Sequence, residues 1–281
     1  MFEDVCTSDG AGGQEVRSSP GIRTEALPLV FAGLGGAVLL FIVAPLLSMF
    51  VSCSLGEVAE TVKDDEVQSS IWLTLWASMA ATVLFAIAAV PFSYLLARKD
   101  FPLKRLVTAV IDLPIVIPHS AAGIALFGVV SREALLGKAA AKMGFGFVDS
   151  SAGVMAAMAF VSIPYLINSA RDGFLGVPVR LEKAALSLGA SPWKVFWTIS
   201  VPLAWRAILS GLILMWARGM SEFGAVLIIA YHPMTTPVLL YERFGAFGLK
   251  YARPVAVVFI SVCLAFFITL RLLARDRDAQ R

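Results

Sequence analysis

The chain has 281 residues, of which 58% are hydrophobic and only 15% charged, and its formal net charge is +3. This balance excludes an ordinary soluble domain and is typical of a protein that crosses a membrane several times. The small positive excess, with no basic aromatic surface beside it, gives no support to nucleic-acid binding.

The first segment, residues 1–24, is rich in Gly, Ser and acidic residues and predicts a flexible tail. The apolar run that follows is too long and too late for a cleaved signal peptide, so we expect it to be retained as a helix. With about 20 apolar residues per crossing, six spans are expected, at residues 27–51, 71–96, 106–130, 152–170, 203–230 and 254–273. Alternating strand patterns are absent, so the fold class is an all-α membrane bundle, with one membrane domain over residues 25–275 and a short tail at 276–281.

Three loops between the spans carry distinct signals. Residues 57–70 are acidic and predict a solvated connector, while residues 131–151 have room for a short external helix. In residues 231–253, two prolines flank Met234, Thr235 and Thr236. That segment is either a re-entrant or external gate or simply an ordered external loop.

The third span contains Pro114 and Pro118, so its helix must be kinked or broken, which frees backbone groups for other partners. His119 follows directly, but a single His at such a place more often serves packing, and it is not assigned as a ligand. Asp112 either pairs with a polar neighbour or lies close to the inner surface.

Residues 181–202 form a more polar insert between apolar segments. A helix rich in Ala and Leu is expected over residues 181–188, ended by Gly189 in a left-handed conformation. Ser191 can cap a second helix, Pro192 suits its first position, and Pro202 is expected to close it. The insert therefore predicts two short helices that meet at a tight turn.

The second of these helices carries an aromatic stripe. Trp193, Phe196, Trp197 and Ser200 follow each other at spacings of three and four residues, which places them on one face. Such a face either docks in a groove of a partner or lies at the level of the lipid headgroups.

The fifth span contains a pair of opposite charges, Arg218 and Glu222, four residues apart. An unpaired charge near the bilayer centre costs about 2.5 to 3.5 kcal/mol, so both side chains should face protein or water and pair. They either border a substrate path or fix helix packing. Gly219 and Gly224 nearby favour close approach of helices.

The distribution of Lys and Arg sets the orientation, because positive charge is retained on the inner side. With the N-terminus inside, the outer side receives only seven of the 23 basic residues, Lys63, Arg132, Lys138, Lys142, Arg243, Lys250 and Arg253. Apart from Arg218, all others fall on the inner side. Both termini and the 181–202 insert are therefore expected in the cytoplasm.

The insert resembles the EAA loop of ABC-type importer permeases. The residues that carry the resemblance are Ala184, Ala185, Gly189, Ala190, Phe196, Ile199 and Pro202; at the usual Glu position stands Lys183, with Glu182 beside it. The resemblance implies a cytoplasmic coupling helix seated in a groove of an ATP-binding subunit. It implies coupling contacts from Glu182, Ala184, Ala185, Gly189, Ala190, Ser191, Phe196, Ile199 and Pro202.

The stretch ARGMSEFGAVLIIAYHPMTTPVLLYERF resembles the matching region of molybdate and tungstate permeases and, less closely, of sulfate permeases. This resemblance implies an importer subunit that spans the cell membrane and contacts the surrounding lipid. It implies that two copies work together with two ATP-binding subunits and with an external oxyanion-binding protein. Residues expected at the path or gate are Ser120, Arg218, Ser221, Glu222 and Thr235.

The chain has no phosphate-binding Gly-x-x-x-x-Gly-Lys-Ser/Thr sequence, so ATP is expected on a partner, and no metal or cofactor of its own is expected. Cys6, Cys53 and Cys263 have no metal-ligand spacing. Three alternatives remain. They are a sulfate or thiosulfate ABC permease, a stand-alone ion-coupled transporter, for which no clear internal repeat is found, and an intramembrane enzyme using Asp112, His119 and Glu222, for which no nucleophile is evident.

Overall fold

The computed structural model describes residues 26–276, and all regular structure in that range is helical. The expected tail at residues 1–24, Cys6, and all but the first residue of the expected tail at 276–281 lie outside the described residues. The chain divides into two units, residues 1–52 and 53–281, and each is described by itself.

The first unit contains α1 (Ala26–Val51), an apolar helix with Pro45 inside it. Its portion Pro28–Val51 is long and apolar enough to cross a membrane, as the sequence predicts for the first span.

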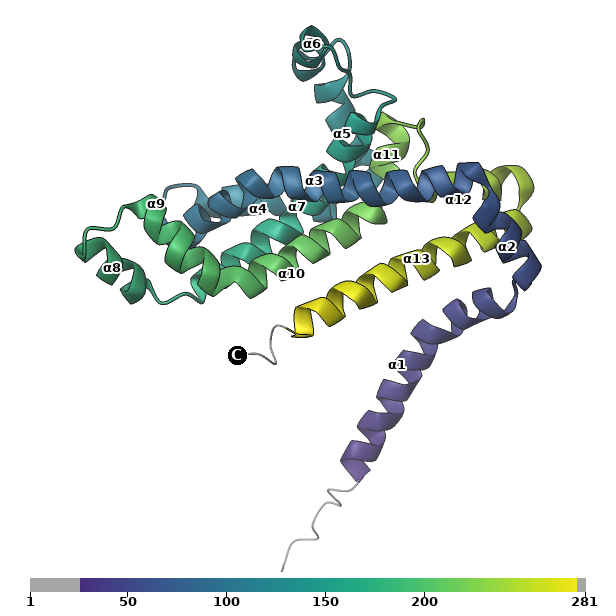
Figure 1. The fold of residues 1–281 in the computed structure, drawn as a ribbon, viewed down its shortest axis with the longest axis horizontal. Coiled ribbons are helices and arrows are strands. Elements are labelled where there is room, and N and C mark those ends of the chain that lie inside the picture. The colour runs from purple at the N-terminus through teal and green to yellow at the C-terminus, as the bar shows by residue number, and fades with distance from the viewer. Residues whose placement is uncertain (1–25, 277–281) are drawn as a thin grey trace, which may run out of the picture. The chain divides into compact units, whose positions relative to one another are not determined.

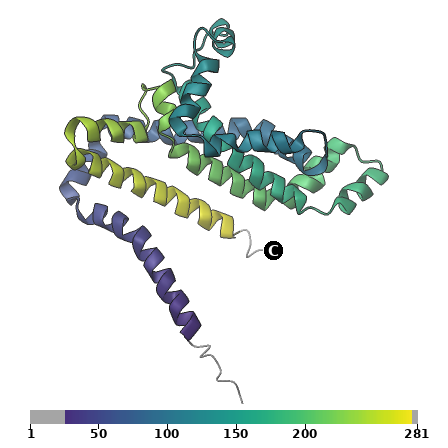
Figure 2. The same cartoon turned by 180° about the vertical axis from the view of Figure 1, so that it is seen from behind.

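The second unit is built around three helices, α3 (Asp65–Arg98), α7 (Ser151–Leu175) and α10 (Val201–Met220), which run side by side (Figures 1 and 2). The other elements are α2 (Leu55–Lys63), α4 (Lys104–Val116), α5 (His119–Val130), α6 (Leu135–Lys142), α8 (Val179–Ser187), α9 (Pro192–Val195), a π-helical turn η1 (Phe196–Ser200), α11 (Gly224–Ile229), α12 (Thr236–Phe247) and α13 (Leu249–Asp276). Among the described residues, five helices satisfy the length and hydropathy of a membrane span, and a bent pair makes a sixth. The predicted helical membrane bundle is confirmed.

Small residues let the three central helices approach closely. A Cβ atom added to Gly173 of α7 would lie 2.4 Å from the Cβ of Ala207, and one added to Gly219 of α10 would lie 3.4 Å from the Cβ of Ser78. The first contact leaves no room for a larger side chain at Gly173, whereas the second is an ordinary van der Waals contact. The expectation that Gly219 serves close approach of helices therefore stays a prediction.

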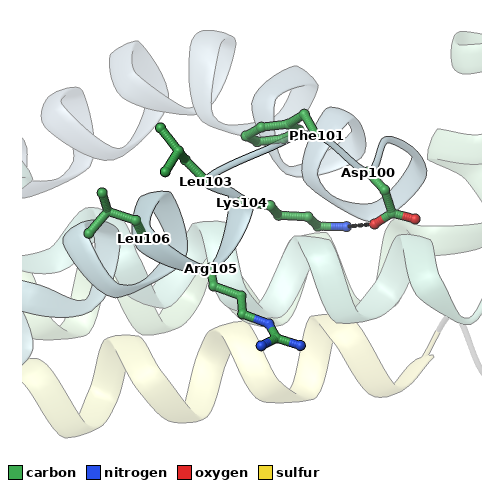
Figure 3. Close-up of a pocket in the computed structure, with 6 residues that line it drawn as sticks. All are labelled: Asp100, Phe101, Leu103, Lys104, Arg105 and Leu106. Carbon is green, nitrogen blue, oxygen red and sulfur yellow. Dashed lines mark hydrogen bonds and ion pairs between the residues drawn. The ribbon is translucent and has the colours of Figure 1, made fainter.

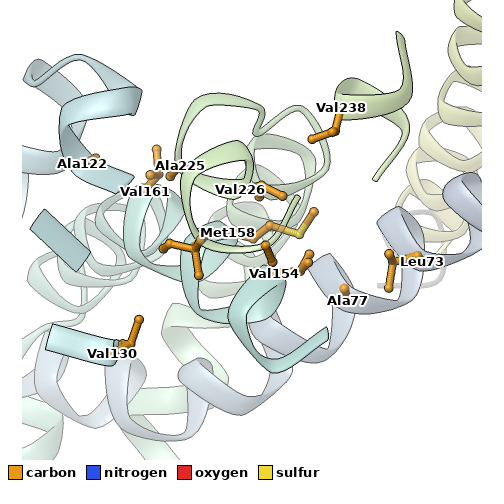
Figure 4. Close-up of a cluster of buried hydrophobic side chains, with 13 residues drawn as sticks. Leu73, Ala77, Ala122, Val130, Val154, Met158, Val161, Ala225, Val226 and Val238 are labelled. Atoms are coloured by element: carbon orange, nitrogen blue, oxygen red, sulfur yellow. The ribbon is translucent and has the colours of Figure 1, made fainter. Parts of the chain in front are cut away.

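One part of the core joins the bundle to the segments that follow α10. Its buried residues come from α3, α5, α7, α11 and α12 (Figure 4), and those labelled are Leu73, Ala77, Ala122, Val130, Val154, Met158, Val161, Ala225, Val226 and Val238. Because α11 and α12 bury side chains in this cluster, both helices are packed against protein, while residues 231–233 between them are exposed.

The third predicted span is broken where its prolines indicate. α4 ends at Val116, α5 begins at His119, and the two axes differ by 117°. Pro118 precedes α5 as its N-cap and has no N–H group to continue the first helix. The prediction of a kinked or broken helix is confirmed.

Two predicted boundaries are wrong. The fifth span, expected over residues 203–230, ends at Met220, and α11 starts only after the break at residues 221–223. The second span, expected from residue 71, begins at Asp65, because Asp64 caps the start of α3. The acidic connector at residues 57–70 is mostly exposed, as expected, and its first part is helical because Ser54 and Glu57 form a capping box that starts α2. Of the short external helix expected within residues 131–151, the structure contains the helix, α6, and its external placement stays a prediction.

Candidate functional site

The insert at residues 181–202 begins as the sequence predicts. α8 ends at Ser187, Gly189 has φ +86°, and Ser191 Oγ accepts a hydrogen bond of 3.3 Å from the Lys194 N–H. Pro192 occupies the first turn of α9. The tight turn between two helices thus follows from a glycine that tolerates positive φ and a serine that caps the next helix.

The end of the second helix is predicted wrongly, because Pro202 does not close it. From α9 the backbone passes through the π-helical turn η1 directly into α10, and residues 192–220 form one continuous helical stretch. The Val201 N–H bonds to the Phe196 carbonyl five residues back. A wider turn of this kind accommodates a residue that has no N–H and would clash in a regular α-helix.

The predicted aromatic stripe is divided between two environments. Trp193 is 65% exposed and Trp197 49% exposed, and their rings meet edge to face with centroids 5.8 Å apart. Phe196 is 4% exposed and packs against Tyr94 of α3 and Phe174 of α7. One side of this helix therefore joins the bundle, while the two tryptophans form an outward aromatic surface.

Of the other expected coupling residues, Ala184, Gly189, Ser191 and Pro202 are exposed and Ala185, Ala190 and Ile199 are half-buried. Glu182 differs from all of these. It is 5% exposed, and its carboxylate faces the bundle rather than the surface on which a partner would dock.

The Glu182 carboxylate is held by three side chains. Arg98 Nε donates to Oε1 and Oε2 at 3.1 and 2.9 Å, and Arg98 Nη2 donates to Oε1 at 2.9 Å. Ser200 Oγ donates to Oε1 at 2.7 Å and Tyr94 Oη donates to Oε2 at 3.3 Å. Arg98 Nη2 also donates to the Val177 carbonyl at 3.0 Å. The carboxylate thus ties α8 to α3 and to η1, and Arg98 extends the cluster to Val177, just after α7.

The pKa of Glu182 reflects this environment. Burial is the largest single effect and raises the pKa, but the hydrogen bonds from Arg98 and Ser200, the charge of Arg98 and the Tyr94 hydroxyl together lower it below its ordinary value. The glutamate is therefore ionised at neutral pH. The resemblance to the EAA loop implied that Glu182 contacts the ATP-binding subunit. Its inward partner Arg98, 84 residues earlier, gave no local signal in the sequence.

A second polar cluster lies where α10 ends. Arg218 Nη2 donates to Glu222 Oε2 at 2.9 Å, so the predicted pair forms, although Glu222 lies beyond the helix end rather than inside a continuous span. Glu222 is 1% exposed, and its Oε1 accepts the Ala225 N–H at 2.9 Å, which satisfies one donor at the start of α11. The pair therefore fixes the break between α10 and α11.

His119 belongs to the same cluster, which sequence reasoning missed. Its Nε2 lies 2.7 Å from Arg218 Nη2, an arrangement in which the guanidinium donates to an unprotonated ring nitrogen. Arg218 Nη1 also donates to Ser221 Oγ at 3.3 Å. The signal that could have found His119 is its place directly after the proline break, where the chain turns.

Gly224 determines how closely these parts meet. A Cβ atom at Gly224 would lie 2.9 Å from the His119 Cβ and 3.0 Å from the Ser120 backbone nitrogen. Four of the five expected path residues, Ser120, Arg218, Ser221 and Glu222, therefore belong to one region, in which Ser120 and Ser221 are exposed. The fifth, Thr235, is not part of it.

Thr235 and Thr236 lie at the start of α12, and both are fully buried. The Thr236 N–H donates to Thr74 Oγ1 of α3 at 2.9 Å, and the Thr236 hydroxyl lies 3.2 Å from Thr74 Oγ1 and 3.4 Å from Ser70 Oγ. Within the described part of the chain, Thr235 Oγ1 is buried without a hydrogen-bond partner. Thr236 thus attaches the start of α12 to α3 through hydroxyl groups, and the neighbouring Thr235 hydroxyl remains without a partner in the described structure.

The end of α3 that precedes Thr74 is also joined to α12 by charge. Arg243 Nη2 donates to Asp64 Oδ2 at 2.7 Å and to Glu66 Oε2 at 2.9 Å. Burial is the largest single effect on Asp64 and raises its pKa, but the hydrogen bond and charge of Arg243, with two backbone N–H groups, hold that pKa below its ordinary value.

The opposite end of α3 is followed by a basic turn. Figure 3 shows the surface pocket there, in which Lys104 Nζ pairs with Asp100 Oδ1 at 2.9 Å while Arg105 projects away from that pair. Between α4 and α7, Asn168 Nδ2 donates to Asp112 Oδ1 at 2.6 Å, so Asp112 has the polar partner that was one of its two expected settings.

Comparison with known proteins identifies the class of the chain. Residues 89–278, which contain both polar clusters, match the family of binding-protein-dependent transport system inner membrane components. The molybdate/tungstate transport system permease protein WtpB of Thermococcus kodakarensis is 42% identical over 260 residues, which is 92% of this chain and 100% of that protein. WtpB of Pyrococcus furiosus is 43% identical over 92% of this chain and 99% of its own length.

More distant matches are a permease named for another oxyanion, sulfate, and transporters of known structure. A probable sulfate transport system permease protein, cysT, of Chlorokybus atmophyticus is 33% identical over 70% of each chain. The solved structure of a bacterial ABC transporter involved in the import of the acidic polysaccharide alginate has a TM-score of 0.69, with 13% identity, over 92% of this chain and 98% of that one. At that identity, the likeness extends to the fold alone.

Proposed function

This chain belongs to the family of binding-protein-dependent transport system inner membrane components, and from that premise we propose that it translocates molybdate and tungstate delivered by an external binding protein. Members of the family are permease subunits of ABC importers, located in the inner membrane, and work with ATPase and binding-protein partners. Two copies of the chain form the path, and two ATP-binding subunits supply the energy.

The observation that carries the substrate assignment is the identity of 42 to 43% with molybdate/tungstate permeases over 92% of the chain, against 33% over 70% with a sulfate permease. The chain's own geometry supports the transport mechanism. The exposed surface around Trp193 and Trp197 is where the ATP-binding subunit docks, on the cytoplasmic side together with both termini. Lipid covers the apolar outer faces of the spans.

The path lies beside the polar cluster at the break between α10 and α11. Arg218 brings positive charge and N–H donors, His119 accepts a hydrogen bond from Arg218 and helps to orient it, and the exposed Ser120 and Ser221 bring hydroxyl groups. A tetrahedral dianion can be guided by such donors without tight binding, because Glu222 already neutralises Arg218. Thr235 belongs to the external gate formed by the segment before α12.

ATP drives the cycle by shifting the population of two bundle arrangements. Nucleotide bound to the partner must favour one arrangement by its binding free energy, because a ligand with equal affinity for both shifts nothing. ATP binding brings the two 181–202 inserts together and opens the outer side, and hydrolysis restores the inward-facing state. No ATP is hydrolysed by this chain.

The test is transport by the reconstituted complex. The chain is co-expressed with its ATP-binding subunit, purified in detergent, placed in lipid vesicles and supplied with the binding protein loaded with molybdate, tungstate or sulfate. We expect ATP-dependent uptake of molybdate and tungstate with little sulfate. Preferential sulfate uptake would refute the substrate, and failure to co-purify with the ATP-binding subunit would refute the importer mechanism. Vesicles without ATP are the control.

A further inference from the structure

We propose that α3 is the mechanical link between the ATP-driven insert and the external gate, with Arg98 and Thr74 as its two attachment points. The inference rests on the proposed function, which places the ATP-binding subunit at the insert and the gate at residues 231–236. It assigns positioning roles to residues that the family resemblance does not mark, namely Arg98, Tyr94, Ser200, Thr74 and Thr236.

The inner attachment is the Glu182 cluster. The Arg98 and Glu182 side chains are 11% and 7% exposed, and their heads meet through two nitrogen atoms at 2.9 Å each. A pair so far removed from water is costly to separate, because each charge would remain buried without its partner. The bidentate geometry also fixes orientation as well as distance. Displacement of α8 by a docked subunit therefore moves the end of α3 with it.

The outer attachment is the hydroxyl cluster around Thr236. Thr74 Oγ1 accepts the Thr236 N–H at 2.9 Å and lies 3.2 Å from the Thr236 hydroxyl, and all of these groups are buried. Separating them would leave a buried backbone N–H unsatisfied. The adjacent Thr235 hydroxyl has no partner in the described structure, so an alternative arrangement of this segment has a buried hydroxyl available for a new bond.

The helix between the two points can carry displacement. From Thr74 to Arg98, α3 is about 36 Å long at the usual rise of 1.5 Å per residue. This length exceeds the thickness of the hydrocarbon core of a membrane, about 30 Å. The hydroxyls of Ser78, Thr82 and Ser93 on this stretch bond back to carbonyls of α3 itself. These hydroxyls do not tie α3 to its neighbours between its ends. One bond to a neighbouring helix lies next to Thr74, where Trp216 Nε1 of α10 donates to the Leu75 carbonyl at 3.4 Å. α3 stays one continuous helix through Pro91, so displacement of one end reaches the other.

The experiment compares molecules of substrate taken up per ATP hydrolysed in vesicles containing the complete complex. Glu182→Gln weakens the inner attachment, and Thr74→Val removes the outer one. A coupling free energy of ordinary size corresponds to about 5- to 150-fold, and we expect each variant to lower the transport-to-ATPase ratio by a factor in that range. The double variant should be no worse than the poorer single variant, because a link broken at one end transmits nothing.

Two matched controls keep this result specific. Thr82→Val makes the same substitution on the same helix, where the buried hydroxyl bonds only to its own helix. Asp100→Asn removes a nearly fully exposed carboxylate near the inner end, paired with Lys104. Both should retain the wild-type ratio. Thr74→Ser, which keeps the hydroxyl, should restore most of the ratio, and Thr74→Ala removes the hydroxyl without adding a methyl group if the valine variant does not assemble.

Three outcomes would overturn the link. They are a double variant whose defect is the product of the two single defects, a Thr82→Val defect equal to that of Thr74→Val, or loss of co-purification with the ATP-binding subunit in Glu182→Gln, which would make Glu182 a docking residue. All ratios are relative to wild type with the oxyanion that wild type carries. A different transported oxyanion would therefore refute the substrate proposal and leave this test intact.

Discussion

Replacing Arg218 by Gln should destabilise the fold strongly, because it leaves the Glu222 carboxylate, 1% exposed, without its cation. Removing one partner of a buried pair costs about 3 to 5 kcal/mol. The Arg218 side chain is 19% exposed and water reaches part of the site, so the lower value of about 3 kcal/mol is expected. That loss raises the ratio of unfolded to folded protein roughly 150-fold.

Glu222→Gln should lower the free energy of unfolding by less, about 1.5 kcal/mol. Its amide oxygen still accepts the Ala225 N–H, and only the charge-assisted bond to Arg218 is lost. In the double variant no charge is left unpaired. Its total loss should be about 2 kcal/mol, smaller than that of Arg218→Gln alone.

The assay is an unfolding titration of each purified variant in mixed detergent micelles. Arg171→Gln is the matched control, since Arg171 pairs at 3.3 Å with an exposed carboxylate of Asp172, and its effect should stay within about 0.5 kcal/mol. If the losses of the two single variants simply add in the double variant to within about 0.5 kcal/mol, the two residues do not act as a pair and the reasoning fails.

Three further variants test other contacts. Gly189→Val should strain the left-handed turn at φ +86° by about 1 to 2 kcal/mol and uncouple ATPase activity from uptake. Gly146→Val, at a position with open space and no positive φ, is the control and should do neither. Coupled uptake at the wild-type level in Gly189→Val would contradict the role of the turn. Gly224→Val should push α5 away from α11 and lower stability by about 1 to 3 kcal/mol in the same titration, and an unchanged midpoint would show that the close approach is unimportant. Arg243→Gln should destabilise the protein at neutral pH, where Asp64 is ionised and paired with Arg243. Because the pKa of Asp64 is lowered in the folded protein, the pair stabilises the fold fully above the unfolded-state pKa and less as the carboxyl is protonated. The difference in free energy of unfolding between variant and wild type should therefore shrink as the pH falls below about 4. A difference that stays constant down to pH 3 would exclude Asp64 as the partner.

Local signals predicted much of the structure. The prolines at 114 and 118 predicted the broken third span, because a missing N–H acts at its own position. Gly189 and Ser191 predicted the turn in the insert for the same reason, since backbone conformation and capping depend on neighbouring residues. Pro202 shows the limit of such reasoning, because one π-helical turn absorbs the proline and lets the helix continue.

The contacts that matter most for the proposed mechanism were not visible in the sequence. Arg98 and Glu182 lie 84 residues apart, and Thr74 and Thr236 lie 162 apart. No periodicity or motif links such positions, since the pairing depends on how α3 packs in the bundle. The Arg218 and Glu222 pair was predicted from its spacing of four, but the helix end between them, which gives Glu222 its second role as a cap, was not.

The broken third span also has a consequence for biosynthesis. α4 has 13 residues and α5 has 12, so each is about 20 Å long or less and neither reaches across a hydrocarbon layer of about 30 Å by itself. α5 packs chiefly against α11, where Gly123 would meet Ala225 if it carried a Cβ atom, and α11 leaves the ribosome about 100 residues later. At a synthesis rate of about 5 to 20 residues per second, α5 waits for its partner for about 5 to 20 seconds. During that interval the half-helix α5 has only its smaller contacts with α6 and α7, so an insertase or chaperone that covers its free face would protect the nascent chain.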